Sequence, residues 1–337
     1  MLNVTLYTRP GCQPCDEVKA ELEELRSQYP HRLAEVNIEA DAALMAKYGQ
    51  IIPVVEAGPY SLKAPITRQK LQMTLGAASD RKNQLEKLDD PTYKARVKKG
   101  KSVTTGDRIS YWIAKRYLLV LNLFMLFYVG LPFLAPTLMK VGAELPANII
   151  YRMYKPLCHQ FGFRSFFLYG EQPFYPLAEA GLTGYTTFDV VSGIPHLDDP
   201  YSVTRFDARN YIGDETVGYK VALCERDIAI YLAILGFGVV FGLTGRRFKS
   251  LHWILWLLIG IGPIGLDGFS QLFSQFNWPW LMSLVPYRES TPYLRVLTGL
   301  LFGLATAWFA YPSIEESMSE TRQYYMKKFA VNQASES

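Results

Sequence analysis

"NVTLYTRPGCQPCDEVKAELEELRSQY" (residues 3–29) places two cysteines between a β-rich run and a charged, amphipathic segment. The run from Asn3 to Thr8 predicts a short strand. After Cys15, the apolar residues Val18, Leu22 and Leu25 recur at helical spacing, with acidic residues on the opposite face. The stretch therefore predicts a strand, a turn that carries C-x-x-C, and a helix.

The next elements continue this α/β pattern. "RLAEVNIEAD" (32–41) predicts a second strand, and "AALMAKYG" (42–49) predicts a short helix. "IIPVVEA" (51–57) predicts a third strand, and "APITRQKLQMTLG" (64–76) a last helix. The resulting order, βαβ followed by ββα, is typical of the thioredoxin-like layout.

These residues resemble a small glutaredoxin-like family over residues 1–78. The resemblance rests on "LYTRPGCQPCDEVKAEL" (6–22) and on Ile52-Pro53 followed by two valines. It implies a thioredoxin fold with a cis proline at Pro53 that faces the cysteines across the site. Sequence alone shows only that an X-Pro bond permits the cis form.

The cysteine pair also has a chemical rationale of its own. Cys12 precedes a predicted helix, whose unpaired N–H groups and dipole stabilise a thiolate, and Arg9 adds positive charge. Cys15 lies one turn later, where it can resolve a mixed disulfide. The alternatives are an incidental pair or half of a zinc site, but no second pair follows nearby. We therefore expect catalysis at Cys12 and Cys15, with Pro53 and Arg9 beside them.

The sequence narrows the partners of this domain. Glutathione-using glutaredoxins share Gly-Gly-x-Asp after the third strand, whereas this chain reads "EAGPYSLKAPITR" (56–68), which argues against glutathione. A protein disulfide or a low-molecular-weight thiol remains as the expected partner.

The net charge of +4 is too small to indicate nucleic acid. The first residues lack a basic and then apolar leader, so we expect this domain in the reducing cytosol.

The rest of the chain predicts an all-α polytopic membrane domain at residues 111–315, after a charged linker at residues 79–110. Four long uncharged runs are the candidate transmembrane helices: 117–139, 228–245, 251–266 and 296–312. The first is long enough for a hydrocarbon core of roughly 30 Å, and Pro132 and Pro136 are expected to kink or end it. Buried helices of a large soluble domain are the alternative, which four such runs disfavour.

The placement of Lys and Arg predicts the orientation. Basic residues precede the first run, fill "GRRFK" (245–249), and follow the fourth run. By the positive-inside rule, both termini lie in the cytoplasm of a multi-pass cell-membrane protein in the lipid bilayer. Residues of about 140–222 then form an outer loop, which turn-forming segments predict to be a small irregular cap. Residues 316–337 form a cytoplasmic tail.

This topology brings polar residues to one level at the outer interface. "CHQ" and "CERD" supply most of them, directly before or beside apolar runs, where charges are costly unless paired or ligated. The expected cluster comprises Cys158, His159, Gln160, Arg164, Cys224, Arg226, Asp227, Asp267, Gln271 and Arg295.

Residues of about 110–320 also resemble a bacterial and archaeal family of predicted integral membrane proteins of unknown function. The matching motifs are Cys-His-Gln followed by Arg-Ser, Cys-x-Arg-Asp with a later Tyr231, Asp-Gly-x-Ser-Gln, and Arg before Thr-Gly. Members often carry Cys-x-x-Cys where this chain has "CERD", so Asp227 stands in the place of a second cysteine. The family implies no reaction, but it implies that these positions form the working site.

Three interpretations of the cluster stay open. Cys158, His159, Cys224 and Asp227 could bind zinc, since these are ordinary zinc donors and Cys224 and Asp227 share one helix face. Adjacent Cys158 and His159 could both ligate only if the backbone bends. Alternatively, Cys158 and Cys224 form a disulfide on the oxidising side. In the third interpretation the charges simply pair.

Two functions follow as hypotheses. The first is a membrane-tethered thiol–disulfide oxidoreductase that acts through Cys12 and Cys15 and is fused to an uncharacterised membrane domain. The second is a membrane protein that handles a metal or small solute, in which the glutaredoxin-like domain senses thiol state or delivers metal. Asp227 and Asp267 near the membrane interior motivate the second hypothesis.

Overall fold

The computed structural model describes residues 1–88, 91–100, 102–197, 199, 202–276 and 287–334. Parts of the expected linker (89–90 and 101) and of the expected tail (335–337) lie outside these residues. The chain divides into two compact units. The first contains Met1–Tyr117 and Glu315–Ser337, and the second contains Leu118–Ile314.

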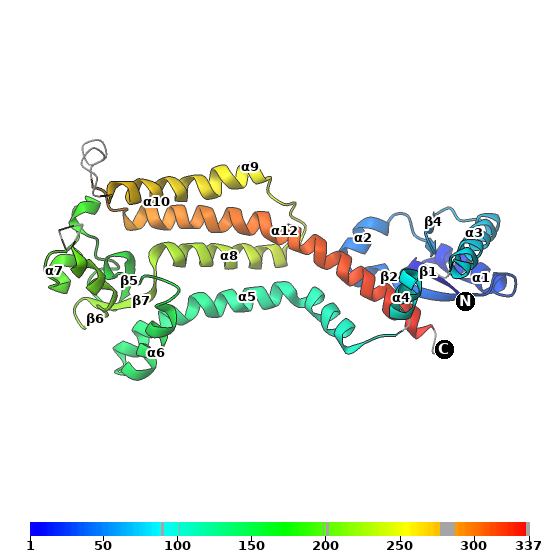
Figure 1. Ribbon diagram of the computed structural model, residues 1–337, viewed down its shortest axis with the longest axis horizontal. Coiled ribbons are helices and arrows are strands. Elements are labelled where there is room, and N and C mark those ends of the chain that lie inside the picture. Colours follow the sequence, from blue (N-terminus) through cyan, green and yellow to red (C-terminus); the bar gives the residue numbers. More distant parts are fainter. Residues whose placement is uncertain (89–90, 101, 198, 200–201, 277–286, 335–337) are drawn as a thin grey trace. The chain divides into compact units, whose positions relative to one another are not determined.

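The first unit contains a four-stranded sheet of order β2-β1-β3-β4 (Figure 1). Its strands are β1 (Leu2–Thr8), β2 (His31–Asn37), β3 (Val54–Ala57) and β4 (Tyr60–Lys63). β1 pairs parallel with β2 and antiparallel with β3, which forms a hairpin with β4. Gly58, with φ of +57°, takes the left-handed conformation that the tight hairpin turn requires. The expected ββα order includes a strand at this place, but no residue range had been predicted for β4.

Helices cover both faces of this sheet. They are α1 (Gln13–Leu25), α2 (Ala42–Tyr48), α3 (Arg68–Lys87) and α4 (Pro91–Gly100), with a short η1 (Ile38–Ala40) before α2. Alternate residues of a strand point to opposite faces. Leu6 accordingly packs with Leu22 of α1 and Leu75 of α3, whereas its neighbour Tyr7 packs with Leu44 of α2. This arrangement confirms the expected thioredoxin-like α/β fold.

The end of the last helix belongs to the first unit. α12 (Pro292–Gln333) continues far beyond the fourth apolar run, and its Met326 and Ala330 pack against the cluster around Tyr7. Lys327 of α12 donates to Glu56 of β3 at 2.7 Å. Residues expected to form a cytoplasmic tail are thus a helix that covers one face of the sheet.

Part of the expected linker is ordered in the same way. α5 (Thr105–Lys140) begins inside it, and Asp107 in the first turn of α5 accepts from Lys328 of α12 at 2.7 Å. Thr104 caps the helix start, since its hydroxyl oxygen accepts from the Asp107 N–H at 3.2 Å, and its own N–H donates to the Asp107 carboxylate at 2.8 Å. A charged segment is therefore fastened by ion pairs that its composition alone does not reveal.

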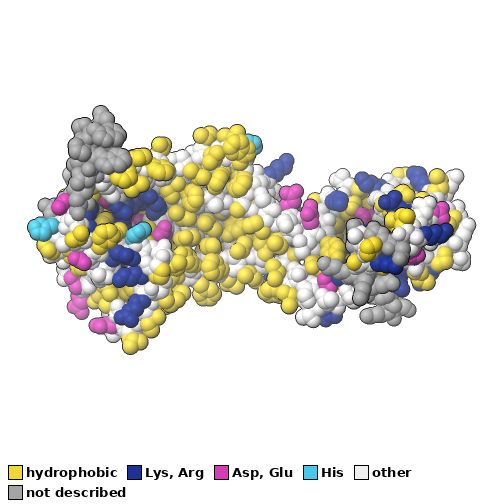
Figure 2. Space-filling model, viewed as in Figure 1, with side chains coloured by type: hydrophobic (Ala, Val, Ile, Leu, Met, Phe, Trp, Pro, Cys, Tyr) yellow, Lys and Arg dark blue, Asp and Glu magenta, His cyan; other side chains and the backbone are white. Residues whose placement is uncertain are grey.

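Within the residues that the structure describes, four helices are long and apolar enough to cross a membrane, as expected. They are the long α5, α8 (Glu225–Leu243), the segment Trp253–Ser274, and α12. The third is built from α9 (Trp253–Leu255), a π-helical η5 (Trp256–Ile261) and α10 (Gly262–Ser274). Hydrophobic side chains, yellow in Figure 2, cover the surface of these helices, as lipid contact requires.

Prolines do not end the first of these helices. Pro132 and Pro136 lie inside α5, which continues to Lys140, although the sequence analysis allowed for an early end. Pro312 likewise lies inside α12. Membrane helices tolerate proline because neighbouring helices and local adjustments satisfy the freed backbone groups.

Glycines let α8 and α12 approach closely in the second unit. A Cβ added to Gly299 would lie 2.6 Å from the Arg226 carbonyl oxygen, and one on Gly303 would lie 2.4 Å from that of Ile230. The G-x-x-x-G spacing in α12 is therefore a helix-packing face, as such motifs are in membranes.

Between α5 and α8 lies a small folded cap. It contains α6 (Glu144–Tyr154), α7 (Phe188–Ser192) and an antiparallel sheet of order β5-β7-β6, built from β5 (Ser165–Leu168), β6 (Gly213–Asp214) and β7 (Gly218–Cys224). Three short 3₁₀ turns complete it: η2 (Gly162–Arg164), η3 (Ala178–Ala180) and η4 (Val203–Arg209). The expectation of an irregular cap missed this sheet, because its strands are short and interrupted by turns. β7 runs directly into α8, so Cys224 joins strand to helix.

Candidate functional site: the cysteine pair and the polar cavity

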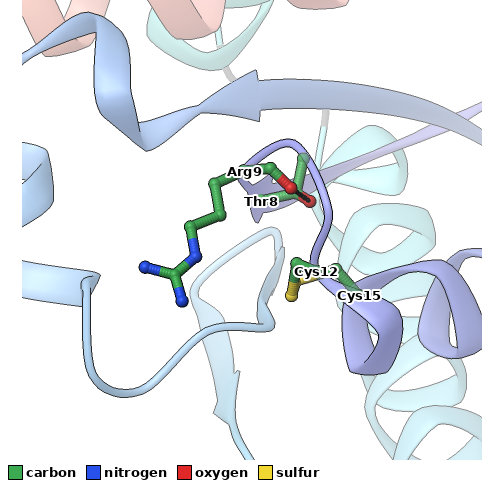
Figure 3. Close-up of a disulfide and its surroundings, with 4 residues drawn as sticks. All are labelled: Thr8, Arg9, Cys12 and Cys15. Carbon is green, nitrogen blue, oxygen red and sulfur yellow. Dashed lines mark hydrogen bonds between the residues drawn. A yellow bond between two sulfur atoms is a disulfide. The ribbon is translucent and has the colours of Figure 1, made fainter.

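Cys12 and Cys15 form a disulfide at the N-terminus of α1 (Figure 3). Cys12 occupies the N-cap position, and its carbonyl oxygen accepts from the backbone N–H groups of Cys15 at 2.9 Å and Asp16 at 3.1 Å. Gly11, with φ of +73°, makes the tight turn that carries the chain from β1 into the helix. The two sulfur atoms are thus held at the helix end where partial positive charge gathers.

The two cysteines differ in burial. Cys15 is 1% exposed and Cys12 is 8% exposed, so Cys12 presents the more accessible sulfur. Residues on either side of Cys12, from Pro10 to Gln13, are exposed. Cys12 is therefore the more exposed member of the pair, and Cys15 is shielded.

Pro53 and Arg9 flank the pair from different elements. The Ile52–Pro53 peptide bond is cis, as the family resemblance implies. The β1–β3 register pairs Val54 with Tyr7, which places Pro53 beside the end of β1, where the cysteine loop starts. Arg9 is exposed on that loop and extends its guanidinium group into the space beside the disulfide (Figure 3).

The second unit contains a polar cavity of about 260 Å³. It lies where the cap meets the starts of α8 and α12 and the middle of α10. Its lining includes nine of the ten residues expected in the polar cluster, with Asp267 behind them. The lining residues are Leu157, Cys158, His159, Gln160, Phe161, Arg164, Cys224, Arg226, Asp227, Gln271 and Arg295.

Two sulfurs and a carboxylate converge in this cavity. One ligand atom each of Cys158, Cys224 and Asp227 lies within 4.8 Å of the others. The backbone N–H of Cys224 donates to Cys158 Sγ at 3.3 Å. Both cysteines are free thiols in this structure, so the disulfide considered from sequence is not formed.

The two thiols are electrostatically linked. The pKa of Cys158 is lowered because its sulfur accepts a hydrogen bond from Cys224, although burial acts in the opposite direction. The pKa of Cys224 is raised because it donates that bond and because it is buried.

His159 does not join this group among the residues that the structure describes. Its exposed ring stacks on Phe161, with ring centroids 5.7 Å apart. Cys158 therefore belongs to the donor group, whereas the adjacent His159 ring packs on Phe161. The four-ligand zinc site expected from sequence is therefore reduced to three donors.

An ion-pair network centred on Glu289 lies against the cavity. Arg164 donates to both of its carboxylate oxygens, at 2.8 and 3.1 Å, and Arg295 also donates to it. Arg295 bonds Glu225 as well, at 3.2 Å. Glu225, Glu289 and Arg295 are all buried, so these charges are stabilised by one another rather than by water.

Asp267 holds a second network. Arg226 pairs with it, Arg288 donates to it at 2.7 Å, and the Ser290 hydroxyl donates at 2.8 Å. Asp267 is buried behind the cavity wall. The three charged residues of "CERD" thus have three different partners: Glu225 pairs with Arg295, Arg226 pairs with Asp267, and Asp227 lies beside the two thiols.

Gln160 and Lys220 hold the loop that carries Cys158, and Lys220 was not among the residues predicted from the sequence. Gln160, with φ of +55°, donates from its side chain to the carbonyls of Tyr151 at 3.0 Å and Ala222 at 2.8 Å. Lys220 of β7 donates to the carbonyls of Gln160 at 2.8 Å and Arg209 at 2.7 Å. The lysine in "KVALC" (220–224), directly before an apolar run, was the signal that could have revealed it.

Burial changes the protonation of this lysine. Lys220 is 1% exposed, and burial lowers its pKa from 10.5 to about 7, with a further contribution from the charge of Lys155. Both of its described hydrogen bonds go to carbonyl oxygens, which a neutral amine can also satisfy.

Comparison with known families agrees with this architecture. Residues 3–76 match the family model described as a glutaredoxin-like domain (DUF836). Residues 216–309 match the model described as a predicted membrane protein (DUF2085). Two family models thus match separate parts of the chain, in agreement with both resemblances noted from the motifs, although the second match is shorter than the residues 110–320 expected.

One curated relative is an uncharacterized protein of Methanocaldococcus jannaschii, which is 24% identical over 206 residues. The match covers 59% of this chain and 92% of that protein. A match of this length exceeds the glutaredoxin-like domain, so it includes part of the membrane-spanning region. No solved structure matches the chain.

Proposed function

We propose that this chain is a membrane-anchored thiol–disulfide oxidoreductase that works through Cys12 and Cys15. The observation that carries the proposal is the bonded C-x-x-C pair at the N-terminus of α1, inside a domain that matches the glutaredoxin-like model. A bonded pair can accept two electrons, and a reduced pair can donate them. The helix end favours the thiolate that such exchange needs.

The exchange proceeds in two steps when the pair is reduced. The Cys12 thiolate attacks one sulfur of a substrate disulfide, forms a mixed disulfide, and releases a thiolate that takes up a proton. Cys15 then loses its proton and attacks Cys12 Sγ, so the Cys12–Cys15 bond forms and the second substrate thiol leaves. Two electrons pass from the pair to the substrate. An external dithiol reduces the pair again.

The more accessible position of Cys12 supports its role as the attacking residue, and the burial of Cys15 supports its role as the resolving residue. Pro53, beside the end of β1, is the proposed positioning residue for the incoming chain. The proposed substrates are a protein disulfide or a low-molecular-weight disulfide. The orientation expected from the basic residues places this chemistry on the cytoplasmic side of the cell membrane.

The test measures disulfide reduction by full-length protein in detergent, with dithiothreitol as the external dithiol. We expect Cys12→Ser to lose all activity, and Cys15→Ser, when it is reduced and then freed of dithiothreitol before substrate is added, to accumulate a mixed disulfide with the substrate. The matched control is the double variant Cys158→Ser/Cys224→Ser, which leaves the pair intact and keeps full activity. Undiminished dithiol turnover in Cys15→Ser contradicts the two-cysteine mechanism.

A second candidate function rests on the other unit. The convergence of Cys158, Cys224 and Asp227 beside a polar cavity favours a membrane protein that handles a metal or a small solute. In that case the glutaredoxin-like domain serves as a thiol sensor or a metal donor. If cells that carry only the Cys12→Ser/Cys15→Ser variant behave like cells with the wild-type protein and unlike cells without it, the result supports this second candidate over the first.

A further inference from the structure

We infer that Cys158, Cys224 and Asp227 form a three-ligand site for a soft divalent cation of the zinc class, with a fourth coordination position open to the polar cavity. This inference is independent of the exchange chemistry at Cys12 and Cys15. It differs from the closed four-ligand site expected from sequence, because His159 stacks on Phe161 instead of joining the donors.

The backbone brings the three donors together. Cys224 and Asp227 are three residues apart at the start of α8, so both project from one face of its first turn. Cys158 follows α6, where its N–H donates to the Tyr154 carbonyl at 2.9 Å. Further along the same segment, Ser165 at the start of β5 lies opposite Cys224 in the β5–β7 pairing, which fixes the cap against the start of α8.

The charge balance leaves a place for a cation. Arg164 and Arg295 are paired with Glu289, Arg295 also with Glu225, and Arg226 with Asp267. Among the described residues, Asp227 forms no ion pair, and its carboxylate faces two thiols instead. The Asp227 carboxylate therefore has no cationic partner among the described residues and is available as a ligand beside the two sulfurs.

The donor set indicates the kind of cation. Thiolates select zinc-class ions over magnesium or calcium, and a carboxylate is an ordinary third zinc ligand. Around an ion with Zn–S of about 2.3 Å, tetrahedral donors lie roughly 3.5–4 Å apart. The donors here lie within 4.8 Å of one another, so rotation of side chains suffices to close them.

The fourth coordination position of the ion opens onto the polar cavity. A cavity of about 260 Å³ adjoins the donors, enough for several waters at about 30 Å³ each. Arg164, Arg226 and Arg295 are among its lining residues. They favour a water or a small anion as the exchangeable ligand, which is the arrangement of catalytic or carrier sites rather than of closed structural ones.

The experiment uses full-length protein in detergent with Cys12→Ser/Cys15→Ser, so that Cys158 and Cys224 are the only cysteines. Co²⁺ is the spectroscopic probe, and Zn²⁺ competes with it. We expect one Co²⁺ per chain with a sulfur-to-cobalt charge-transfer band, displaced by Zn²⁺. Further substitution of Cys158 or Cys224 by serine removes the band. Asp227→Asn weakens binding at least as much as the roughly 10–100-fold typical for loss of an outer-shell partner.

His159→Ala is the matched control and keeps the band, since this exposed ring is outside the donor group. The Cys12→Ser/Cys15→Ser protein also allows an alkylation measurement without further substitutions. We expect Zn²⁺ to protect both remaining thiols from alkylation and a chelator to make them reactive again. Equal alkylation with and without Zn²⁺, or undiminished Co²⁺ binding after loss of both cysteines, overturns the inference. A Cys158–Cys224 disulfide in protein isolated from the membrane overturns it as well.

Discussion

Arg322 of α12 donates from Nε to Asp41 Oδ2 at 2.6 Å, across 281 residues of sequence. Asp41 is also the N-cap of α2, since its other oxygen accepts from the N–H groups of Ala43 at 3.0 Å and Leu44 at 3.1 Å. Arg322 further donates to the Ala114 carbonyl of α5 at 3.0 Å and to Glu315 at 2.6 Å. One buried guanidinium therefore joins α2, α5 and α12 within the first unit.

Replacement of this arginine is expected to destabilise the first unit strongly. Arg322→Met leaves the Asp41 carboxylate buried without its partner, which typically costs about 3–5 kcal/mol. The measurement is thermal unfolding in detergent, followed by protection of the Cys12–Cys15 region from proteolysis. The matched control is Lys19→Ala, which breaks an ion pair with Glu35 whose side chains are 44% and 43% exposed. Such exposed pairs contribute about 0–1 kcal/mol. Equal losses in the two variants contradict a structural role for α12 in this unit.

Lys220 predicts a pH dependence of the second unit. Its pKa is about 7 in the folded protein and 10.5 in the unfolded chain, so between these values the unfolded chain binds more protons. Stability therefore rises with pH from about 7 to 10.5, and it falls as pH drops toward 7, by on the order of a few kcal/mol over the window. The measurement is the midpoint of thermal unfolding at several pH values.

Lys220→Met is expected to flatten this rise, because the titrating group is gone. Arg152→Ala serves as the control, since Arg152 is exposed on α6 and should leave the slope unchanged. A wild-type midpoint that is constant across the window shows that Lys220 titrates near its ordinary value.

Glycine substitutions test the contact between α8 and α12. Gly303→Ala places a Cβ 2.4 Å from the Ile230 carbonyl oxygen and 2.8 Å from Ala233 Cβ, so the helices must move apart. We expect a loss of about 1–3 kcal/mol, as for other overpacked sites. Gly236→Ala in α8 is the control, because nothing lies within 4 Å of its added Cβ. Comparable midpoints for both variants would argue against close packing at Gly303.

The orientation of the membrane domain is open to a direct test. In a Cys15→Ser/Cys158→Ser/Cys224→Ser variant, Cys12 is the remaining thiol. The Lys/Arg pattern predicts that a bulky, membrane-impermeant thiol reagent labels it in inverted membrane vesicles and not in intact cells. Labelling in intact cells reverses the topology and moves the proposed exchange to the other side of the membrane.

Local sequence signals were sufficient for the elements and the cysteine pair. The β-rich run of β1 and the helical spacing of Val18, Leu22 and Leu25 are signals within a few residues, and the structure contains the corresponding strand and helix. The expected ββα order implied β4 without giving its residues, and the cap strands β5, β6 and β7 were not anticipated, because such short strands are stabilised by pairing rather than by their own pattern.

The sequence by itself determined a C-x-x-C turn between a strand and a helix, four membrane-crossing helices, and the set of residues around the polar cavity. Those features follow from spacing and hydropathy, which are properties of consecutive residues. Only the tertiary structure decided which partners each charge takes, that His159 turns away from Cys158, and that the end of α12 covers the glutaredoxin-like sheet. Each of these depends on side chains from distant segments meeting in space. Burial makes such pairings energetically decisive, and no local pattern records them.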